Sequence, residues 1–261
     1  MTRELLQQIA EYCDAAPRAV TEVETVGGFE LFIGPRDGWQ FAARPALNGT
    51  GWTVTDVGRA LSRQLQLDMA LQFAWVEEHS PGLADVMAAA GLELQRFPLL
   101  VLSPEVDVVS PVLPEHAESN GATDVARGEV RAAVTDDEIA AFASVGVVAF
   151  TFGGTERGEE GIDELREATG MRMSALIDFE RGLLEAGGTV RLAAFADQDP
   201  VSTGVVQRIG AVAELTGIGT LPAFRREGHG RRVTQKLVAA GRELGAATLF
   251  LTVYGDELER T

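Results

Sequence analysis

Two arginines and two glycines precede a predicted helix in the last third of the chain, at Arg225, Arg226, Gly228 and Gly230. Glycine has no Cβ, so a ligand can approach the main chain closely. The first N–H groups of a helix have no partners within the helix and lie at the positive end of its dipole. Together with the charge of the two arginines, these groups are suited to binding a pyrophosphate.

The same residues also fit an ordinary strand–turn–helix unit whose arginines are solvated. Two glycines separated by one residue are a weak signal by themselves. The spacing of the whole segment, from a strand that ends near Pro222 to a helix that runs to Leu244, favours the ligand-binding interpretation.

The pattern Arg225-x-x-Gly228-x-Gly230 resembles the Arg/Gln-x-x-Gly-x-Gly/Ala coenzyme A signature of the GNAT superfamily of N-acetyltransferases. The resemblance extends over residues 205–253 and, more loosely, over residues 129–196. It therefore covers about half of the chain. It implies an acyl-CoA-dependent N-acyltransferase with acetyl-CoA as its co-substrate.

The resemblance also implies which residues bind the coenzyme. The strand before the loop would separate from its neighbour and pair its main chain with the pantetheine arm, and the loop amides would hold the pyrophosphate. We expect His229 to face solvent as the variable position of the loop. The implied coenzyme-binding residues are Ile218, Gly219, Thr220, Arg225, Arg226, Glu227, Gly228, His229, Gly230 and Arg231.

Glu214 stands eleven residues before Arg225. Some histone-type members of the superfamily have a glutamate general base at that spacing, so the resemblance implies this role for Glu214. It would accept a proton from the acceptor ammonium, through a water molecule, because an amine must be neutral to attack a thioester. The alternative is a carboxylate that points away from the sheet into solvent.

Three functions remain open at this point. The first is direct transfer of an acetyl group from acetyl-CoA to an amine acceptor, either a small molecule or a peptide, without a covalent enzyme intermediate. The second is a coenzyme A-binding or regulatory protein with impaired catalysis. The third is an unrelated α/β scaffold with a structural loop. A dehydrogenase is disfavoured, because no Gly-x-Gly-x-x-Gly follows an early strand with an acidic residue about 20 positions on.

The charge of the chain bears on its partners. The net charge is −17, and the residues from Ala196 onward hold eight acidic and eight basic side chains, so the excess lies before them. Such acidity disfavours nucleic acid as a partner. It weakly favours a cationic small molecule or a basic peptide, although a soluble acidic surface is the more common reason for such a charge. The sequence is also compatible with a homodimer.

No apolar run approaches the 18 residues of a membrane span, and the first residues lack the pattern of a secretory signal. We therefore expect a cytoplasmic protein with no membrane partner. Cys13 is the single cysteine, which excludes an internal disulfide and a cysteine-based zinc site. We expect no metal site and interpret Cys13 as a small apolar residue of the first helix.

The second half of the chain predicts the order β, α, α, β, β, β, α, β. Three consecutive strands before the loop indicate an antiparallel meander that leads into a βαβ unit. Thr135 and the acidic residues after it predict a helix start with a capping box. The predicted elements are strands at 129–134, 190–196, 204–208, 211–220 and 248–253, helices at 135–143, 162–168 and 173–186, and a loop followed by a helix over 225–244.

The first half has a less regular pattern. Its predicted elements are helices at 3–15, 57–67 and 82–90, and strands at 19–26, 29–33, 40–44, 69–76, 92–95 and 98–102. Three prolines and several acidic residues mark 103–128 as a linker, with a short strand at 106–109.

We predict the α/β (α+β) class, with two GNAT-like domains that each contain a mixed, mainly antiparallel sheet flanked by helices. Residues 1–102 would form a degenerate N-terminal copy, residues 103–128 the linker, and residues 129–261 the acyl-CoA-binding domain. The second copy lacks the last helix and two strands of the family. The end of the first half resembles that missing part, so we further hypothesise that the first half fills the open sheet edge of the second.

Overall fold

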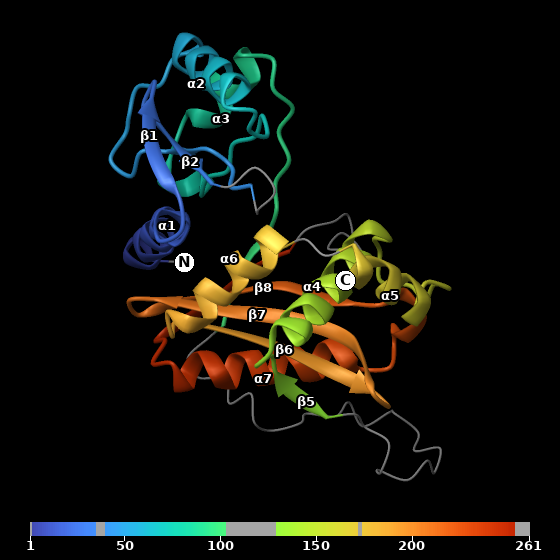
Figure 1. Cartoon of the computed structure of the whole chain (residues 1–261). Helices are drawn as coiled ribbons and strands as arrows, with labels where there is room; N and C mark the ends of the chain where they lie inside the picture. The colour runs from blue at the N-terminus through green and yellow to red at the C-terminus, as the bar shows by residue number, and fades with distance from the viewer. Residues whose placement is uncertain (1, 35–39, 103–128, 172–173, 254–261) are drawn as a thin grey trace. The chain divides into compact units, whose positions relative to one another are not determined.

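The computed structural model describes residues 2–34, 40–102, 129–171 and 174–253 (Figure 1). The chain divides into two compact units, Met1–Arg96 and Phe97–Thr261. The predicted linker at 103–128, with its short strand, lies outside the described residues.

The first unit contains a three-stranded antiparallel sheet in the order β1-β2-β3. Gly27 and Gly28 both have positive φ and make the turn between the first two strands, where residues with a Cβ would be strained. The strands are β1 (Glu22–Val26), β2 (Phe29–Ile33) and β3 (Arg44–Pro45), and the helices are α1 (Arg3–Arg18), α2 (Val54–Gln66), the short 3-10 helix η1 (Glu77–His79) and α3 (Leu83–Ala89).

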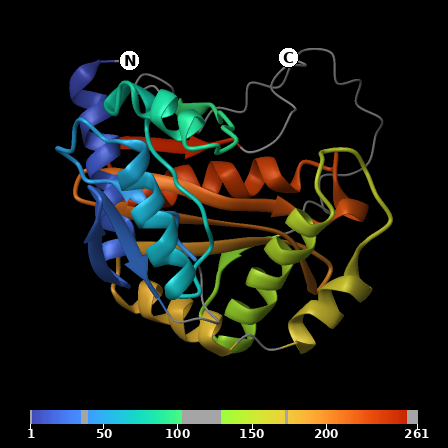
Figure 2. The ribbon, with the colours of Figure 1, turned by 90° about the horizontal axis from the view of Figure 1, so that it is seen from above.

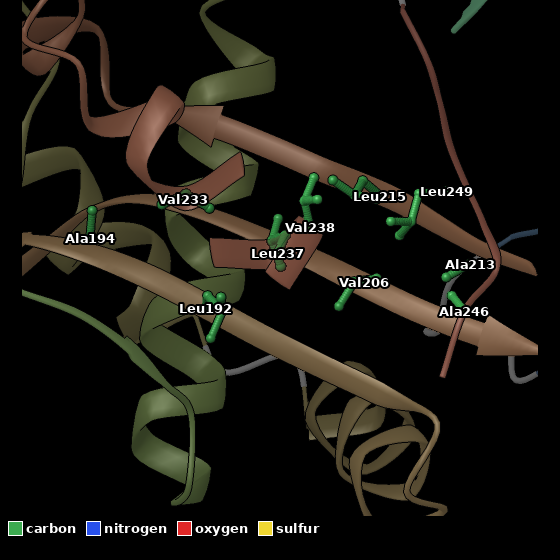
Figure 3. Packing of buried hydrophobic residues seen from close by; sticks show 10 residues of the cluster. All are labelled: Leu192, Ala194, Val206, Ala213, Leu215, Val233, Leu237, Val238, Ala246 and Leu249. Carbon is green, nitrogen blue, oxygen red and sulfur yellow. The ribbon is translucent and has the colours of Figure 1, made fainter. Parts of the chain in front are cut away.

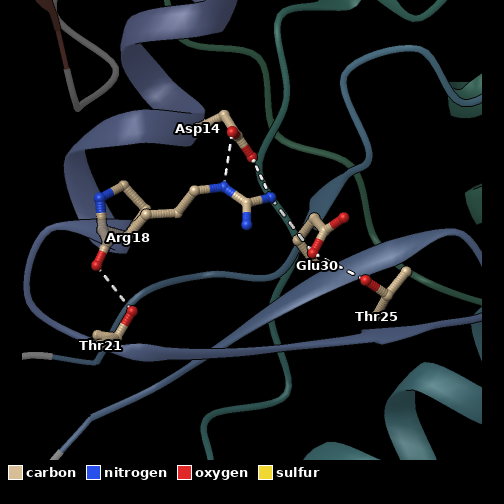
Figure 4. Close-up of polar contacts among 6 residues, drawn as sticks. Asp14, Arg18, Thr21, Thr25 and Glu30 are labelled. Carbon is tan, nitrogen blue, oxygen red and sulfur yellow. Dashed lines mark hydrogen bonds and ion pairs between the residues drawn. The ribbon is translucent and has the colours of Figure 1, made fainter.

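A charged cluster joins α1 to the sheet of this unit (Figure 4). The guanidinium of Arg18 donates to Asp14 at 2.7 Å and lies 3.3 Å from the carboxylate of Glu30 on β2. Thr25 donates to the same Glu30 carboxylate at 3.1 Å. Asp14 and Glu30 are both buried, so the paired guanidinium compensates the cost of enclosing them.

Two of the predicted strands in the first unit are wrong. Residues 69–76 make one isolated bridge, between Ala43 and Phe73, and residues 92–95 form no strand. Their apolar side chains nevertheless pack on the core of the unit, among them Met69, Phe73 and Leu92. An irregular backbone therefore buries these apolar residues, at least in part, without a strand ladder.

The second unit contains a six-stranded sheet in the order β4-β9-β8-β7-β6-β5. All of its neighbouring pairs are antiparallel except β8 and β9, which are parallel. This confirms the predicted meander and the βαβ unit that follows it. The strands are β4 (Leu99–Val101), β5 (Val130–Ala132), β6 (Thr189–Ala196), β7 (Asp199–Ile209), β8 (Val212–Thr220) and β9 (Thr248–Thr252).

Helices cover both faces of this sheet (Figures 1 and 2). Alternate residues of a strand point to opposite faces, so Leu192 packs with α7 while its neighbour Ala193 contacts Phe142 of α4. The helices are α4 (Asp136–Thr151), α5 (Ile162–Gly170), α6 (Ser174–Glu185), the 3-10 helix η3 (Pro222–Phe224) and α7 (His229–Glu243). In the described part of the chain, no helix has both the length and the apolar content needed to cross a bilayer.

The core under α7 fixes that helix against the centre of the sheet (Figure 3). Leu237 and Val233 of α7 are fully buried against Val206 of β7. A Cβ on Gly204 would lie 2.6 Å from Leu237, so glycine at this position permits the close approach of helix and strand. The first turn of α7 is therefore held at a defined place beside the end of β8.

Helix α4 is longer than predicted and ends at Thr151 rather than near residue 143. The predicted capping box is present, with Thr135 and Glu138 bonded to each other's main-chain N–H groups. Apolar residues continue on all sides of the helix, so no change of pattern marks where it stops. The apolar stretch at its end packs Val145 and Val148 against the sheet.

Strand β4 occupies one edge of the second sheet. Its residues Leu99–Val101 pair antiparallel with β9, and the N–H of Leu102 donates to Leu249 at 2.9 Å. The hypothesis that the first half covers the open sheet edge is confirmed for this strand. Residues 97–102, which we predicted as the end of the first domain, thus belong to the second compact unit.

Candidate functional site: the opening between β8 and β9 and the start of α7

Strands β8 and β9 separate partway along their length. Their parallel pairing ends at Glu214 and Phe250, although β8 continues to Thr220. A bulge accompanies the separation, because the register with β7 shifts after Thr203 and Gly217 has a φ of 61°. A bulge bends its strand and increases the local twist. Among the described residues, no strand therefore pairs with the edge of β8 that faces β9 from residue 215 onward.

The last residues of β8 are held from the side of β7. Leu221 donates its N–H to Val201 at 2.9 Å, so the alternation of an antiparallel ladder turns the main-chain N–H of Thr220 toward the open side. The carbonyl of Gly219 accepts from the hydroxyl of Ser202 at 2.8 Å. A Cβ on Gly219 would lie 2.8 Å from Ala149 of α4, so a glycine is required there by the close approach of that helix.

The segment that follows β8 presents a row of main-chain N–H groups. Arg226 and Gly228 both have left-handed backbone, with φ of 65° and 81°. The first amide of α7 with an acceptor is that of Arg232, which donates to Gly228 at 3.1 Å, and no side chain caps the helix. Among the described residues, the amides of residues 226–231 have no acceptor. Such a row at a helix N-terminus is suited to binding an anion.

Arg225 does not direct its charge toward these amides. The residue is 9% exposed, and its guanidinium donates to main-chain carbonyls of α4, of the segment after α4 and of β8. The distances are 3.1 Å to Ala149, 2.6 Å to Phe152, 2.9 Å to Gly153, 3.4 Å to Glu156 and 3.2 Å to Thr220. From the sequence, we expect the Arg225 charge to lie beside the pyrophosphate. Instead, the guanidinium is buried and hydrogen-bonded to protein carbonyls.

The exposed charges of the loop are linked to residues 153–161, which connect α4 with α5. Arg226 pairs with Glu156 at 2.6 Å, and Glu227 pairs with Arg157 at 3.1 Å. Two main-chain bonds support the same contact, since Gly158 donates to Pro222 at 3.1 Å and Ala223 donates to the carbonyl before Gly161 at 2.9 Å. Arg231 is exposed on the first turn of α7.

The expectation that His229 faces solvent is wrong. Its side chain is 7% exposed, and its ring lies edge-on to that of Phe224. Arg232 lies 2.7 Å from Nδ1, and the carboxylate of Glu227 lies 3.5 Å from Nε2. Burial is the main cause that lowers the pKa of His229, the Arg232 charge acts in the same direction, and Glu227 opposes both. The first residue of α7 faces inward because the preceding 3-10 turn places Phe224 against it.

Glu214 lies at the point where β8 and β9 separate. Its neighbours Ala213 and Leu215 both belong to the core under α7, so the Glu214 side chain points to the opposite face, where α4 packs. It is partly buried and lies opposite Gln207 of β7. The structure therefore brings Glu214 and the open edge of β8 to one region of the sheet.

Sequence reasoning missed the residues that hold the site from outside the motif. Ser202 bonds the end of β8, and Glu156 and Arg157 pair with the loop before α7. The charged, glycine-rich character of residues 153–161 was visible in the sequence. Nothing local indicated that this segment contacts residues about 70 positions later.

Comparison with known proteins identifies a family for the segment that contains this site. Residues 159–259 match the model of the acetyltransferase (GNAT) family. This segment is a GNAT acetyltransferase domain. The match spans from just before α5 to beyond β9 and includes the opening between β8 and β9 and the start of α7. None of the curated proteins compared matches the chain.

One solved structure shares the fold over most of the chain, and others match about half of it with lower scores. A GCN5-related N-acetyltransferase from Kribbella flavida matches with a TM-score of 0.63 and 21% identity, over 98% of this chain and 88% of its own. The PaiA N-acetyltransferase from Thermoplasma acidophilum, solved in complex with coenzyme A, matches with a TM-score of 0.36 and 15% identity, over 49% of this chain and 81% of its own. Glucosamine-6-phosphate N-acetyltransferase from Arabidopsis thaliana matches with a TM-score of 0.34 and 15% identity, over 49% and 84%.

Proposed function

We propose that the chain is an acyl-CoA-dependent N-acyltransferase that moves an acetyl group from acetyl-CoA to an amine acceptor. The observation that carries this proposal is the row of main-chain N–H groups at residues 226–231, which have no acceptor among the described residues. Their place at the positive end of a 15-residue helix suits a pyrophosphate. The family of this domain supports the same coenzyme.

The residues of the chain have distinct parts in binding the coenzyme. The amides of residues 226–231 hold the pyrophosphate, and the exposed guanidinium groups of Arg226 and Arg231 add positive charge. The open edge of β8, at Ile218 and Thr220, pairs with the amides of the pantetheine arm, while the main chain of Gly219 between them is bonded on the side of β7. This places the thioester near the point where β8 and β9 separate.

The proposed reaction is a direct attack on the thioester. The neutral amine nitrogen attacks the carbonyl carbon, a C–N bond forms and the C–S bond breaks; the nitrogen then loses one proton to become an amide, and the leaving thiolate takes up a proton to become a thiol. Glu214 accepts the proton that the acceptor ammonium must lose before the attack, through a water molecule. The acceptor is a small molecule or a peptide with a primary amine.

Coenzyme binding can be tested with Gly228→Glu. The new carboxylate would repel a pyrophosphate, and the left-handed backbone of Gly228 would be strained by any side chain. We expect calorimetry to detect coenzyme A binding to the unchanged protein and at least about 100-fold weaker binding to the variant. Gly210→Glu is the matched control, because Gly210 also has a positive φ and open space but lies in the turn between β7 and β8.

Turnover separates the enzyme from a coenzyme-binding or regulatory protein. We expect thiol release from acetyl-CoA that depends on an added primary amine, with Glu214→Gln slowing it by about 100-fold and leaving coenzyme affinity unchanged. Binding without turnover against a panel of amines would instead support the regulatory function. Absence of coenzyme A binding to the unchanged protein would refute both.

A further inference from the structure

Arg225 is enclosed by carbonyl groups. Each of its side-chain nitrogens donates: Nε to Thr220, Nη1 to Gly153 and Glu156, and Nη2 to Ala149 and Phe152. In the described part of the chain, no carboxylate forms an ion pair with this guanidinium. A buried cation without a counter-ion is costly unless dipoles compensate it, and here five carbonyls do so.

The five acceptors come from three segments that bear on the coenzyme site. Ala149 and Phe152 lie at the C-terminal end of α4, where the helix dipole favours a cation. Gly153 and Glu156 begin the connection to α5, and Thr220 is the last residue of β8. A planar guanidinium with five N–H groups can join three segments in one plane, which an ammonium cannot.

We propose that Arg225 is a positioning residue, which holds the end of β8, the end of α4 and residues 153–156 together so that the amides of residues 226–231 converge on the pyrophosphate. This inference rests on the proposed function. Arg225 acts through its carbonyl bonds and makes no contact with the phosphate. To reach a phosphate, its guanidinium would have to abandon five hydrogen bonds in a buried setting.

Arg226 and Arg231 provide the contrast within the same loop. Both are exposed, and the ion pair of Arg226 with Glu156 lies on the surface and is therefore weak. Their charges are free to turn toward an anion. Arg225 thus shapes the loop, whereas Arg226 and Arg231 can contact the ligand.

Whether Arg225→Gln or Arg225→Lys has the larger effect on the KM for acetyl-CoA distinguishes a positioning role from direct contact with the phosphate. Arg225→Gln keeps two donors and no charge, whereas Arg225→Lys keeps the charge on a compact group that cannot span the three segments. We expect both variants to raise the KM for acetyl-CoA, and Arg225→Lys to raise it more than Arg225→Gln. The kcat at saturating acetyl-CoA should stay within about twofold of that of the unchanged protein. The salt dependence of coenzyme A affinity should be unchanged by Arg225→Gln and reduced by the control Arg231→Gln.

A larger rise in the KM for acetyl-CoA with Arg225→Gln than with Arg225→Lys would overturn the inference. A phosphate ligand at this position predicts that Arg225→Lys retains near-normal affinity, while Arg225→Gln weakens it and lowers its salt dependence. A fall in kcat without a change in KM would equally contradict a role in shaping the coenzyme loop.

Hydrogen exchange on the protein without coenzyme tests the same inference independently of the proposed function. The amides of Gly158 and Ala223 are bonded across the joined segments, and that of Arg208 on β7 is bonded elsewhere, to the carbonyl of Gly188 at 2.7 Å. We expect Arg225→Gln to speed exchange at Gly158 and Ala223 by about tenfold or more, and to leave Arg208 unchanged. Arg231→Gln should change none of the three.

Equal acceleration at all three amides would show a general loss of stability and overturn the positioning role, and so would unchanged exchange at Gly158 and Ala223. If the unchanged protein fails to bind coenzyme A, the proposed function fails, while the exchange result still decides whether Arg225 holds the three segments together.

Discussion

His229 begins α7 with its imidazole enclosed between Phe224 and the side chains of Arg232 and Glu227. The neutral ring can accept a hydrogen bond from Arg232 at Nδ1, and a proton on that nitrogen would remove this acceptor. Burial is the main cause that lowers the pKa of His229, and the neighbouring Arg232 charge lowers it further because a second cation at this place is unfavourable. A neutral His229 adds no positive charge to the start of α7.

This predicts a specific pH dependence of stability. The folded-state pKa of His229 lies below its ordinary value of 6.5, so the unfolded chain takes up the proton first as the pH falls. Stability from His229 is complete above about pH 6.5 and is lost as the pH drops toward the folded-state pKa. We expect the free energy of unfolding to fall more steeply below pH 6.5 in the unchanged protein than in His229→Gln, measured by urea unfolding. His79→Gln is the control, and an identical slope in all three proteins would contradict the prediction.

Helix α4 is joined to β5 through its first turn. The Glu138 carboxylate accepts from the N–H groups of Val134 and Thr135 at 2.9 and 3.1 Å and pairs with Arg131 of β5. Arg131 in turn lies over the ring of Phe195 on β6, 4.4 Å from its centroid. One carboxylate thus orients both the helix that packs on β8 and the edge strand beside it.

Glu138→Gln should destabilise the second unit in a pH-dependent way. The bonds from Val134, Arg131 and Thr135 lower the pKa of Glu138 from an ordinary 4.5 to about 2, so its contribution is present above about pH 4.5 and is lost as the pH falls through about 2. We expect a loss of about 1 kcal/mol at pH 7 that shrinks toward pH 3. The measurement is urea unfolding, with Asp137→Asn in the same turn as the control. A pH-independent loss would mean that shape rather than charge matters.

The packing of α7 depends on glycine where the helix crosses the sheet. A Cβ on Gly204 would meet Leu237 at 2.6 Å and Val233 at 3.2 Å, whereas a Cβ on Gly182 in α6 would meet nothing within 4 Å. Gly204→Ala should therefore cost about 1–3 kcal/mol, and Gly182→Ala should stabilise by about 0.5–1 kcal/mol because alanine favours the helix. Thermal unfolding of the two variants measures both effects, and the same sign for both would refute this account.

The second compact unit is completed at one edge by a strand from the first part of the sequence. Leu102 donates to Leu249, and Val253 donates to Pro98 at 3.0 Å, so the ladder alternation directs the N–H of Leu100 toward β9 and that of Val101 outward. The edge of the sheet therefore depends on residues more than 140 positions away from β9. This connectivity places the predicted linker between two strands of one sheet.

Proline substitutions in β4 test that arrangement. Leu100→Pro removes a ladder donor and should lower Tm by about 2–4 °C, the shift expected for about 1 kcal/mol in a unit of this size. Val101→Pro removes an N–H that faces away from β9 and should be tolerated better, as proline is on sheet edges. Leu100→Ala controls for the side chain, which is 47% exposed. Equal losses for the two prolines would argue against the pairing.

The order of elements in the second unit could be predicted because its signals are local. Thr135 and Glu138 mark a helix start within four residues, and Gly228 and Gly230 mark the turn into α7. The predictions of strands at 69–76 and 92–95 were wrong because strand formation depends on a distant partner rather than on a local signal. Apolar spacing reports burial, but a strand exists only where another backbone lies alongside to pair with it.

The sequence by itself determined the position of the glycine-containing loop before α7, the meander that leads to it and the family that both resemble, since these depend on residue type and short spacing. The tertiary structure alone decided what each side chain of that loop does. The partner of Arg225 in α4, Ala149, lies more than 70 residues earlier in the chain. His229 is enclosed by a turn that the linear pattern did not reveal. Contacts between distant residues form only when separate elements pack, and no short stretch of sequence specifies them.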